Sequence, residues 1–351
     1  MQGVWGIAGI TMKSHAADRR TVLGLKAGLA LEKPWRPSPA AQDQLAHSMP
    51  TQHRSVVDTL RVLSDSAGRI ARQQKFSAAV NFWSKAIRDP SALATWIEYI
   101  VAHHSAHNAP LPNTRVLRKP QRNYGRTGRT VRERVDALIA HYDFAAAHLL
   151  PKAHLEILSG GQIHLAKLDA RDTAFNLWLG SSLPSGQKQE GELTVLLTDG
   201  SGVALARMGF TFGQDADGAA TLLIGGLQGL EAGIDKRLIV RATRTLSGLR
   251  PKDAALVGVQ AIARAVGVRR VLAVSNATHV LAAEWFGSES VISRDYDGFW
   301  QERGGVRDGR GGFELPLRDY SARVAATPTP RLIDRHRAIL SERVAASFAK
   351  R

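Results

Sequence analysis

Five strand patterns in succession, followed by two helix patterns and one further strand, limit the folds open to this chain more than any other feature of its sequence. Turn signals such as Asp199-Gly200-Ser201-Gly202 separate the strand patterns, and side chains between Ala204 and Phe212 alternate between two faces. We therefore expect an antiparallel meander. Its strands should cover Gln162–Leu168, Thr173–Leu179, Leu193–Thr198, Val203–Phe212 and Ala219–Leu227.

Two helices are expected to connect the meander to its last strand. The first covers Asp235–Leu246, and the second covers Pro251–Val266, with a proline at its start and Gly267 after its end. Because two helices cross over, the short strand Arg270–Val274 should lie parallel to the strand that ends at Gly225. The fold class is therefore α/β, with an N-terminal helical region followed by a mixed, mainly antiparallel sheet with helices.

The chain is expected to divide into three regions. Residues 1–150 read as a basic helical region, because apolar side chains recur there at helical spacing. Proline and glycine residues interrupt this pattern near residues 108–129, where we expect an exposed loop. Residues 151–330 should form the α/β domain, and residues 331–351 a basic C-terminal helix.

The net charge of +16 indicates an anionic partner. Basic residues concentrate between Arg115 and Arg134, so an anionic ligand is expected there, and nucleic acid, an anionic membrane surface or merely a solvated loop remain alternatives. The chain has no cysteine, which excludes disulfides, thiolate metal sites and a cysteine nucleophile. His103 and His107 have the helical spacing of zinc ligands, but no third ligand is close in sequence. We interpret them as exposed histidines at a helix end and expect no metal.

A set of short motifs between Gln189 and Pro316 resembles the VirK/YbjX family of proteobacterial proteins. The matching stretches are Glu190-Gly191-Glu192-Leu193-Thr194, Ile224-Gly225-Gly226-Leu227-Gln228-Gly229, Arg241-Ala242-Thr243-Arg244, Gly248-Leu249-Arg250-Pro251-Lys252-Asp253, Leu272-Ala273-Val274-Ser275-Asn276, His279, Asp295-Tyr296-Asp297-Gly298-Phe299-Trp300 and Phe313-Glu314-Leu315-Pro316. The chain departs from the family at Val280-Leu281, where a Tyr-Arg pair is usual. The resemblance implies an association with bacterial virulence and envelope properties, and it assigns no reaction.

The order of elements is also similar to the core of the acyl-CoA N-acyltransferases. That similarity implies a coenzyme A thioester whose pyrophosphate is held by backbone N–H groups after the fifth strand. Gly226, Gln228 and Gly229 would then approach the cofactor. Arg237 and Arg241 would add positive charge for its phosphates, and Asn276 would face its pantetheine arm. The glycine spacing departs from the usual loop of that family, and a tight strand exit with close packing explains the same glycines.

Two further residues are candidates for acid–base chemistry. His279 follows the last strand by a few residues and could act as a general base, or it could instead hydrogen-bond the loop backbone. Tyr296 could protonate a leaving thiolate as a general acid. Alternatively, Tyr296 and the neighbouring Phe299 and Trp300 dock a helix on the sheet, and the composition of this stretch favours that docking role.

These observations lead to two hypotheses of different class. The first is an acyltransferase-like protein that transfers an acyl group from coenzyme A to an envelope-related or small-molecule acceptor. The second is a non-enzymatic basic accessory protein that binds RNA or the anionic inner surface of the membrane through Arg115–Arg134. No stretch has the length of a membrane-spanning helix, and we expect a cytoplasmic location, with a peripheral position at the inner membrane left open.

Overall fold

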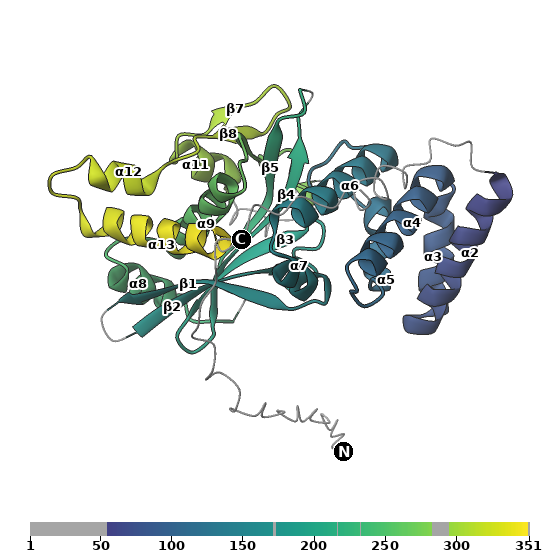
Figure 1. The fold of residues 1–351 in the computed structure, drawn as a ribbon, viewed down its shortest axis with the longest axis horizontal. Helices are drawn as coiled ribbons and strands as arrows, with labels where there is room; N and C mark the ends of the chain where they lie inside the picture. Colours follow the sequence, from purple (N-terminus) through teal and green to yellow (C-terminus); the bar gives the residue numbers. More distant parts are fainter. Residues whose placement is uncertain (1–54, 171–172, 216, 232, 283–294, 350–351) are drawn as a thin grey trace, which may run out of the picture. The chain divides into compact units, whose positions relative to one another are not determined.

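The computed structural model describes residues 55–170, 173–215, 217–231, 233–282 and 295–349, and within these ranges eight strands form one sheet (Figure 1). The strand order is β1-β2-β3-β4-β5-β6-β8-β7. The strands cover β1 Gln162–Ala170, β2 Thr173–Ser181, β3 Leu193–Asp199, β4 Ala204–Gln214, β5 Ala220–Gln228, β6 Arg270–Ala273, β7 Val306–Arg307 and β8 Phe313–Leu315. The predicted α/β class and antiparallel meander are confirmed, whereas β7 and β8 were not expected from the sequence pattern.

The strands β5 and β6 form the one parallel pair among the described strands, as the crossover connection predicted. They pair from Thr221 opposite Arg270 to Ile224 opposite Ala273. Strand β5 then continues to Gln228 along β4, while β6 ends. The β4–β5 register shifts at Gly209/Phe210, so Gly225 has no partner in the ladder. Beyond Ile224, β5 has no partner among the described strands on the side of β6. The sequence predicted the cofactor at this edge.

The helices begin and end at residues that explain their boundaries. Helix α4 begins at Pro90, with Asp89 accepting a hydrogen bond from the N–H of Ala92. A capping box between Thr130 and Glu133 starts α6. The helices cover α2 Val56–Gln73, α3 Phe76–Ala86, α4 Pro90–Ala106, α5 Thr114–Leu117, η1 Lys119–Gln121, α6 Val131–His148, α7 Pro151–Leu158, α8 Arg237–Thr245, α9 Pro251–Ala265, α11 Tyr296–Gln301, α12 Tyr320–Ala325 and α13 Leu332–Ala349.

Two hydrophobic clusters stabilise the described part of the chain. Helices α9 and α13 pack on each other and on the sheet, and their apolar side chains bury the strand residues Leu177, Val195 and Met208. A second cluster lies among α2, α3, α4 and α6, centred on Phe82 and Trp96. Figure 1 shows α9 and α13 to one side of the strands and α6 to the other. Residues 1–54 of the predicted basic helical region lie outside the described residues.

The predicted exposed loop near residues 108–129 needs correction. This segment contains α5 and η1, and its residues Lys119, Tyr124 and Gly125 are buried. The N–H of Gly125 donates to the carbonyl of Gln189, and the N–H of Thr127 donates to the carbonyl of Thr278. Proline and glycine residues correctly marked irregular backbone, but tertiary contacts decided that it lies against the sheet.

The interpretation of the histidine pair as exposed is also wrong for His103. Its side chain is buried where α4 packs against α6, and a third histidine, His154 of α7, lies beside it. His107 is half-buried. Among the described helices, none has the length and apolarity needed to cross a membrane.

Candidate functional site at the end of the parallel strands

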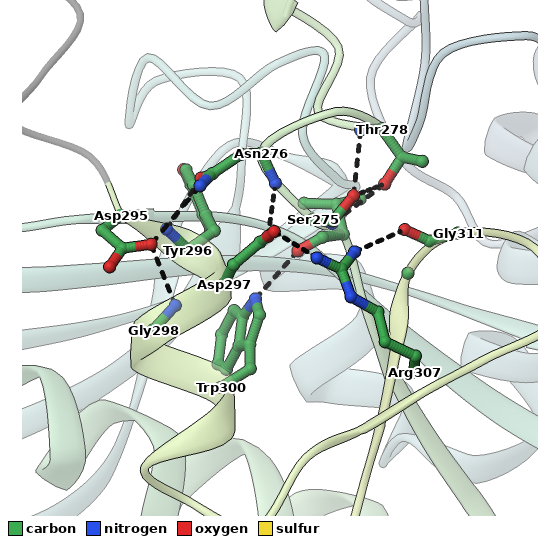
Figure 2. Close-up of polar contacts among 12 residues, drawn as sticks. Ser275, Asn276, Thr278, Asp295, Tyr296, Asp297, Gly298, Trp300, Arg307 and Gly311 are labelled. Carbon is green, nitrogen blue, oxygen red and sulfur yellow. Dashed lines mark hydrogen bonds and ion pairs between the residues drawn. The ribbon is translucent and has the colours of Figure 1, made fainter.

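The chain that leaves β6 folds into a tight polar turn. The N–H of Ser275 donates to Oγ1 of Thr278 at 2.9 Å, and the N–H of Thr278 donates to Oγ of Ser275 at 3.1 Å (Figure 2). These reciprocal bonds satisfy backbone groups that have no strand partner after Ala273. The turn presents Asn276 toward the start of α11 and brings His279 into the interior.

Asn276 binds the start of α11. Its Oδ1 accepts a 2.9 Å hydrogen bond from the N–H of Tyr296, and its Nδ2 donates to Asp295 at 3.3 Å (Figure 2). The N–H of Asn276 donates to Asp297 at 2.8 Å, and Asp297 also forms an ion pair with Arg307. Asn276, predicted to face a pantetheine arm, therefore uses its amide oxygen and nitrogen within the protein.

Tyr296 lies beside the free edge of β5. Its side chain is 3% exposed, and its hydroxyl accepts a 3.2 Å hydrogen bond from the N–H of Leu227. The hydroxyl is also 3.4 Å from the carbonyl oxygen of Leu227. Trp300 of the same helix donates from Nε1 to the carbonyl of Val274 at 2.8 Å. Helix α11 thus contacts both the end of β5 and the chain that leaves β6, as the docking interpretation of this stretch requires.

A buried carboxylate, Glu190, lies over the glycines of β5. Its Oε1 is 3.1 Å from Nε2 of His279, and its Oε2 accepts from Nε2 of Gln228 at 3.2 Å. The side chain of His279 is fully buried, and that of Glu190 nearly so. The N–H of Leu281 donates to Nδ1 of His279 at 3.2 Å, so Nδ1 carries a lone pair and Nε2–H faces Glu190. Both ring nitrogens of His279 are hydrogen-bonded within the protein.

The structure brings together some of the predicted site residues and separates others. His279, Tyr296, Gln228 and Gly226 share one neighbourhood, because His279 and Tyr296 have ring centroids 5.0 Å apart and Glu190 contacts Gln228 and covers Gly226. Gly229 lies further along, near the side chain of Lys252. Arg237 and Arg241 are exposed on α8 and form no ion pair with any described residue. Their predicted roles toward a cofactor stay predictions.

A cleft of about 620 Å³ opens on the sheet beside β6, and arginines line it. Arg126 and Arg129, from the segment before α6, are half-buried and line it together with Arg310 and Thr278. Nε of Arg126 is buried without a partner among the described residues, and Nη1 donates only a long bond, 3.4 Å, to the carbonyl of Arg310. Burial is the main cause that lowers the pKa of Arg129, and Arg126 contributes in the same direction. We call these residues the arginine cleft.

A second polar cluster is buried between the helical region and the sheet. Lys119 forms an ion pair with Glu192, whose other oxygen accepts a 2.8 Å bond from Tyr142. Burial, and then the charge of Glu192, raise the pKa of Tyr142 well above its usual range. Glu192 and Tyr142 also line a cavity of about 420 Å³, together with His154.

Sequence reasoning did not identify Glu190 as a site residue. The sequence offers one signal, the motif Glu190-Gly191-Glu192 directly before an apolar strand, where two carboxylates at the start of a buried element need partners. Those partners, His279 and Lys119, lie far away along the chain, so the pairing itself is visible only in the structure.

Comparison with known proteins gives two findings. Residues 71–330 match the family model described as "Protein of unknown function (DUF535)". Among curated proteins, the "Uncharacterized protein YbjX" of Escherichia coli (strain K12) is 30% identical over 215 residues, which cover 58% of this chain and 64% of that protein. The chain therefore matches less than two thirds of the length of this relative. Because the family model covers well over half of the sequence, the chain belongs to the DUF535 family, in agreement with the resemblance to VirK/YbjX proteins.

Proposed function

We propose that the chain is an acyltransferase-like protein that binds a coenzyme A thioester, with the ligand's phosphates in the arginine cleft. One observation carries this proposal. Arg126 and Arg129 are half-buried beside β6, and neither forms an ion pair with a described carboxylate. Glu133 stabilises the charge of Arg129 without forming an ion pair with it, and a bound phosphate would supply a closer negative charge together with hydrogen-bond acceptors.

The arginine cleft fits phosphates better than the edge of β5 does. At that edge the N–H of Leu227 already donates to Tyr296, and the side chain of Gln228 already donates to Glu190. A pyrophosphate bound there would have to displace both contacts. In the cleft, Arg126 Nε has no partner to lose among the described residues.

The buried cluster of Glu190, His279 and Tyr296 has a positioning role in this proposal. An acid role for Tyr296 and a base role for His279 would require each to leave hydrogen bonds within the protein. We therefore propose that they hold the ends of β5 and β6 in place beside the ligand. The residues that would contact the phosphates are Arg126, Arg129 and Arg310.

Calorimetric titration with acetyl-coenzyme A, coenzyme A, pantetheine and inorganic phosphate tests this proposal. The double variant Arg126→Gln/Arg129→Gln should weaken coenzyme A binding by roughly tenfold or more, since one charge-assisted hydrogen bond contributes about 1.5–3 kcal/mol. Pantetheine lacks the phosphates, so the same change should leave its affinity unaltered.

Arg237→Gln/Arg241→Gln is the matched control, because it also removes two positive charges and both residues are exposed on α8. Coenzyme A affinity should be nearly unchanged in this variant. Selective loss of binding in the α8 variant would instead place the phosphates where the sequence predicted them. The absence of binding by any coenzyme A species would contradict the proposal altogether.

A second candidate function, binding to RNA or to anionic lipid, is favoured by one surface. Lys85 and Lys188 have lowered pKa values, caused first by burial and then by the nearby charges of Arg122 and other arginines. The charges of Arg118 and Arg122 therefore act on both lysines, which places several positive charges close together. Binding to RNA or to phosphatidylglycerol vesicles should fall steeply with salt. If the partner is nucleic acid, Arg115→Gln/Arg122→Gln should make the slope of log binding constant against log salt concentration less steep. The slope should change by about 0.7–0.9 for each phosphate that is no longer neutralised. An unchanged salt slope would contradict this candidate.

A further inference from the structure

Helices α4 and α7 bring three histidines together in the helical region. His103 lies in the last turn of α4, His107 follows the end of that helix four residues later, and His154 lies in the first turn of α7. One ring nitrogen of each lies within 4.8 Å of those of the other two. Nε2 of His103 is 3.0 Å from Nε2 of His154, and both rings are almost completely buried.

The hydrogen bonds of His103 place its ring proton on Nδ1. Tyr99 has a single hydroxyl proton, and its shortest contact is 2.5 Å to the exposed carboxylate of Asp143. The hydroxyl oxygen of Tyr99 is therefore an acceptor for Nδ1–H of His103, 3.3 Å away. The lone pair of His103 is left on Nε2, which faces His154.

His107 is held in the same tautomer by a backbone carbonyl. Its Nδ1 is 2.8 Å from the carbonyl oxygen of His103, which can only accept, so Nδ1 carries the proton. Nε2 of His107 then carries a lone pair as well. Metal-ligating histidines usually donate their other ring N–H to a carboxylate, a backbone carbonyl or water. His107 donates to a backbone carbonyl, and His103 is linked to the carboxylate of Asp143 through the hydroxyl of Tyr99.

The third ring, His154, would complete the set after a change of tautomer. Without a metal its Nε2 donates to Nε2 of His103, 3.0 Å away. Its Nδ1 is buried and has no hydrogen-bond partner among the described residues, so this nitrogen can take the proton when Nε2 binds a metal. We propose that His103, His107 and His154 bind a Zn²⁺ ion through their Nε2 atoms. Nitrogen ligands of one tetrahedral zinc ion lie roughly 3.3–3.5 Å apart. The His103–His154 pair, at 3.0 Å, is close to this separation, and the three nitrogens lie within 4.8 Å of one another, so the side chains would have to move closer around the ion.

The chemistry of the donors selects the class of metal. Three neutral imidazoles suit zinc and neighbouring transition metals, whereas Ca²⁺ and Mg²⁺ require oxygen ligands. The proposed ion would join the last turn of α4 to the first turn of α7. Three protein ligands leave the fourth position of a tetrahedral ion to water or to a ligand.

Metal content and Zn²⁺ affinity of the full chain, purified without a histidine tag, test the proposal. We expect one zinc ion per chain by mass spectrometry of the metals, and visible absorption bands of tetrahedral Co²⁺ after exchange. His107→Gln removes a half-buried ligand with little change in packing. Loss of a residue that hydrogen-bonds a metal ligand lowers metal affinity roughly 10–100-fold, and Tyr99→Phe should lower Zn²⁺ affinity by that amount. His107→Gln removes a ligand itself, so its Zn²⁺ affinity should fall by more than this.

His164→Gln is the control, because His164 is an exposed histidine on β1 that contacts Asn176. Its Zn²⁺ affinity and Co²⁺ spectrum should equal those of the parent chain. Far-UV circular dichroism identifies any variant that fails to fold, and His107→Gln is then replaced by His107→Asn. Equal Zn²⁺ affinity in parent and folded His107 variants would overturn the proposal, as would preferential binding of Mg²⁺ or Ca²⁺.

Discussion

At the scale of single residues, the absence of a side chain at Gly225 allows Glu190 to reach the interior. A Cβ atom added at Gly225 would overlap the backbone carbonyl of Glu190, and one at Gly226 would overlap its side chain. The two glycines therefore leave the space in which Glu190 packs against β5. This is the close-packing alternative that the sequence analysis left open, and the close approach is to Glu190 and Gly125.

The contrast between Gly225 and Gly229 gives a test at this scale. Gly225→Ala should lower the free energy of unfolding by about 1–3 kcal/mol or more, because backbone cannot yield as a flexible side chain can. Gly229→Ala should change it by less than about 0.5 kcal/mol, since the added Cβ would lie 3.5 Å from Cε of Lys252. Denaturant unfolding checks both. Equal stability of the two variants would show that Glu190 does not pack on β5 as described.

At the scale of elements, helix α6 supplies the hydrogen-bond partner for a backbone N–H of β4 that lies beyond the end of the neighbouring strand β3. The β3–β4 ladder ends where Leu193 pairs with Phe210, so Phe212 on β4 lies beyond it. The N–H of Phe212 donates instead to Nδ1 of His141, 3.0 Å away on α6. Burial is the main cause that keeps the pKa of His141 well below its usual 6.5, and the nearby Lys119 acts in the same direction.

The lowered pKa of His141 predicts acid sensitivity. In the unfolded chain the group takes up a proton below about pH 6.5, whereas the folded chain keeps it neutral. The contribution of His141 to the unfolding free energy is therefore fully present above that pH. It falls as the pH is lowered, by up to about 1.4 kcal/mol per pH unit. Denaturant unfolding between about pH 7 and pH 5, with a metal chelator present, measures the slope.

His141→Asn isolates this contribution, because asparagine does not titrate and its side-chain oxygen can still accept from Phe212. The variant should show a smaller loss of stability on acidification than the parent. An identical pH slope in both proteins would mean that His141 is not neutral in the folded state.

At the scale of the whole described chain, the buried pair Lys119–Glu192 joins the helical cluster to the sheet. Lys119 lies in η1, and Glu192 comes immediately before β3. Tyr142 of α6 also donates to Glu192, so one carboxylate gathers contacts from two helical segments. The hydrophobic clusters on the two sides of this pair have separate memberships. The ion pair is thus a polar link between two apolar cores.

Removing the lysine alone should be more damaging than removing both charges. Lys119→Met leaves a buried carboxylate without its cation and should cost about 3–5 kcal/mol of unfolding free energy. Adding Glu192→Gln removes the uncompensated charge while the amide oxygen still accepts from Tyr142, so part of the loss should be recovered. Thermal or denaturant unfolding of the single and double variants measures this. A double variant no more stable than Lys119→Met would contradict the proposed link.

The sequence by itself determined the sheet order through β6, because alternation, hairpin turns and a two-helix crossover are local patterns. It also singled out His279 and Tyr296 as candidate residues, but their ring contact was established only by the structure. The tertiary structure alone decided that Glu190 contacts His279, that Arg126 and Arg129 face a cleft, and that His154 joins His103. Those partners are distant in sequence, and no periodicity records which buried charge or imidazole meets which.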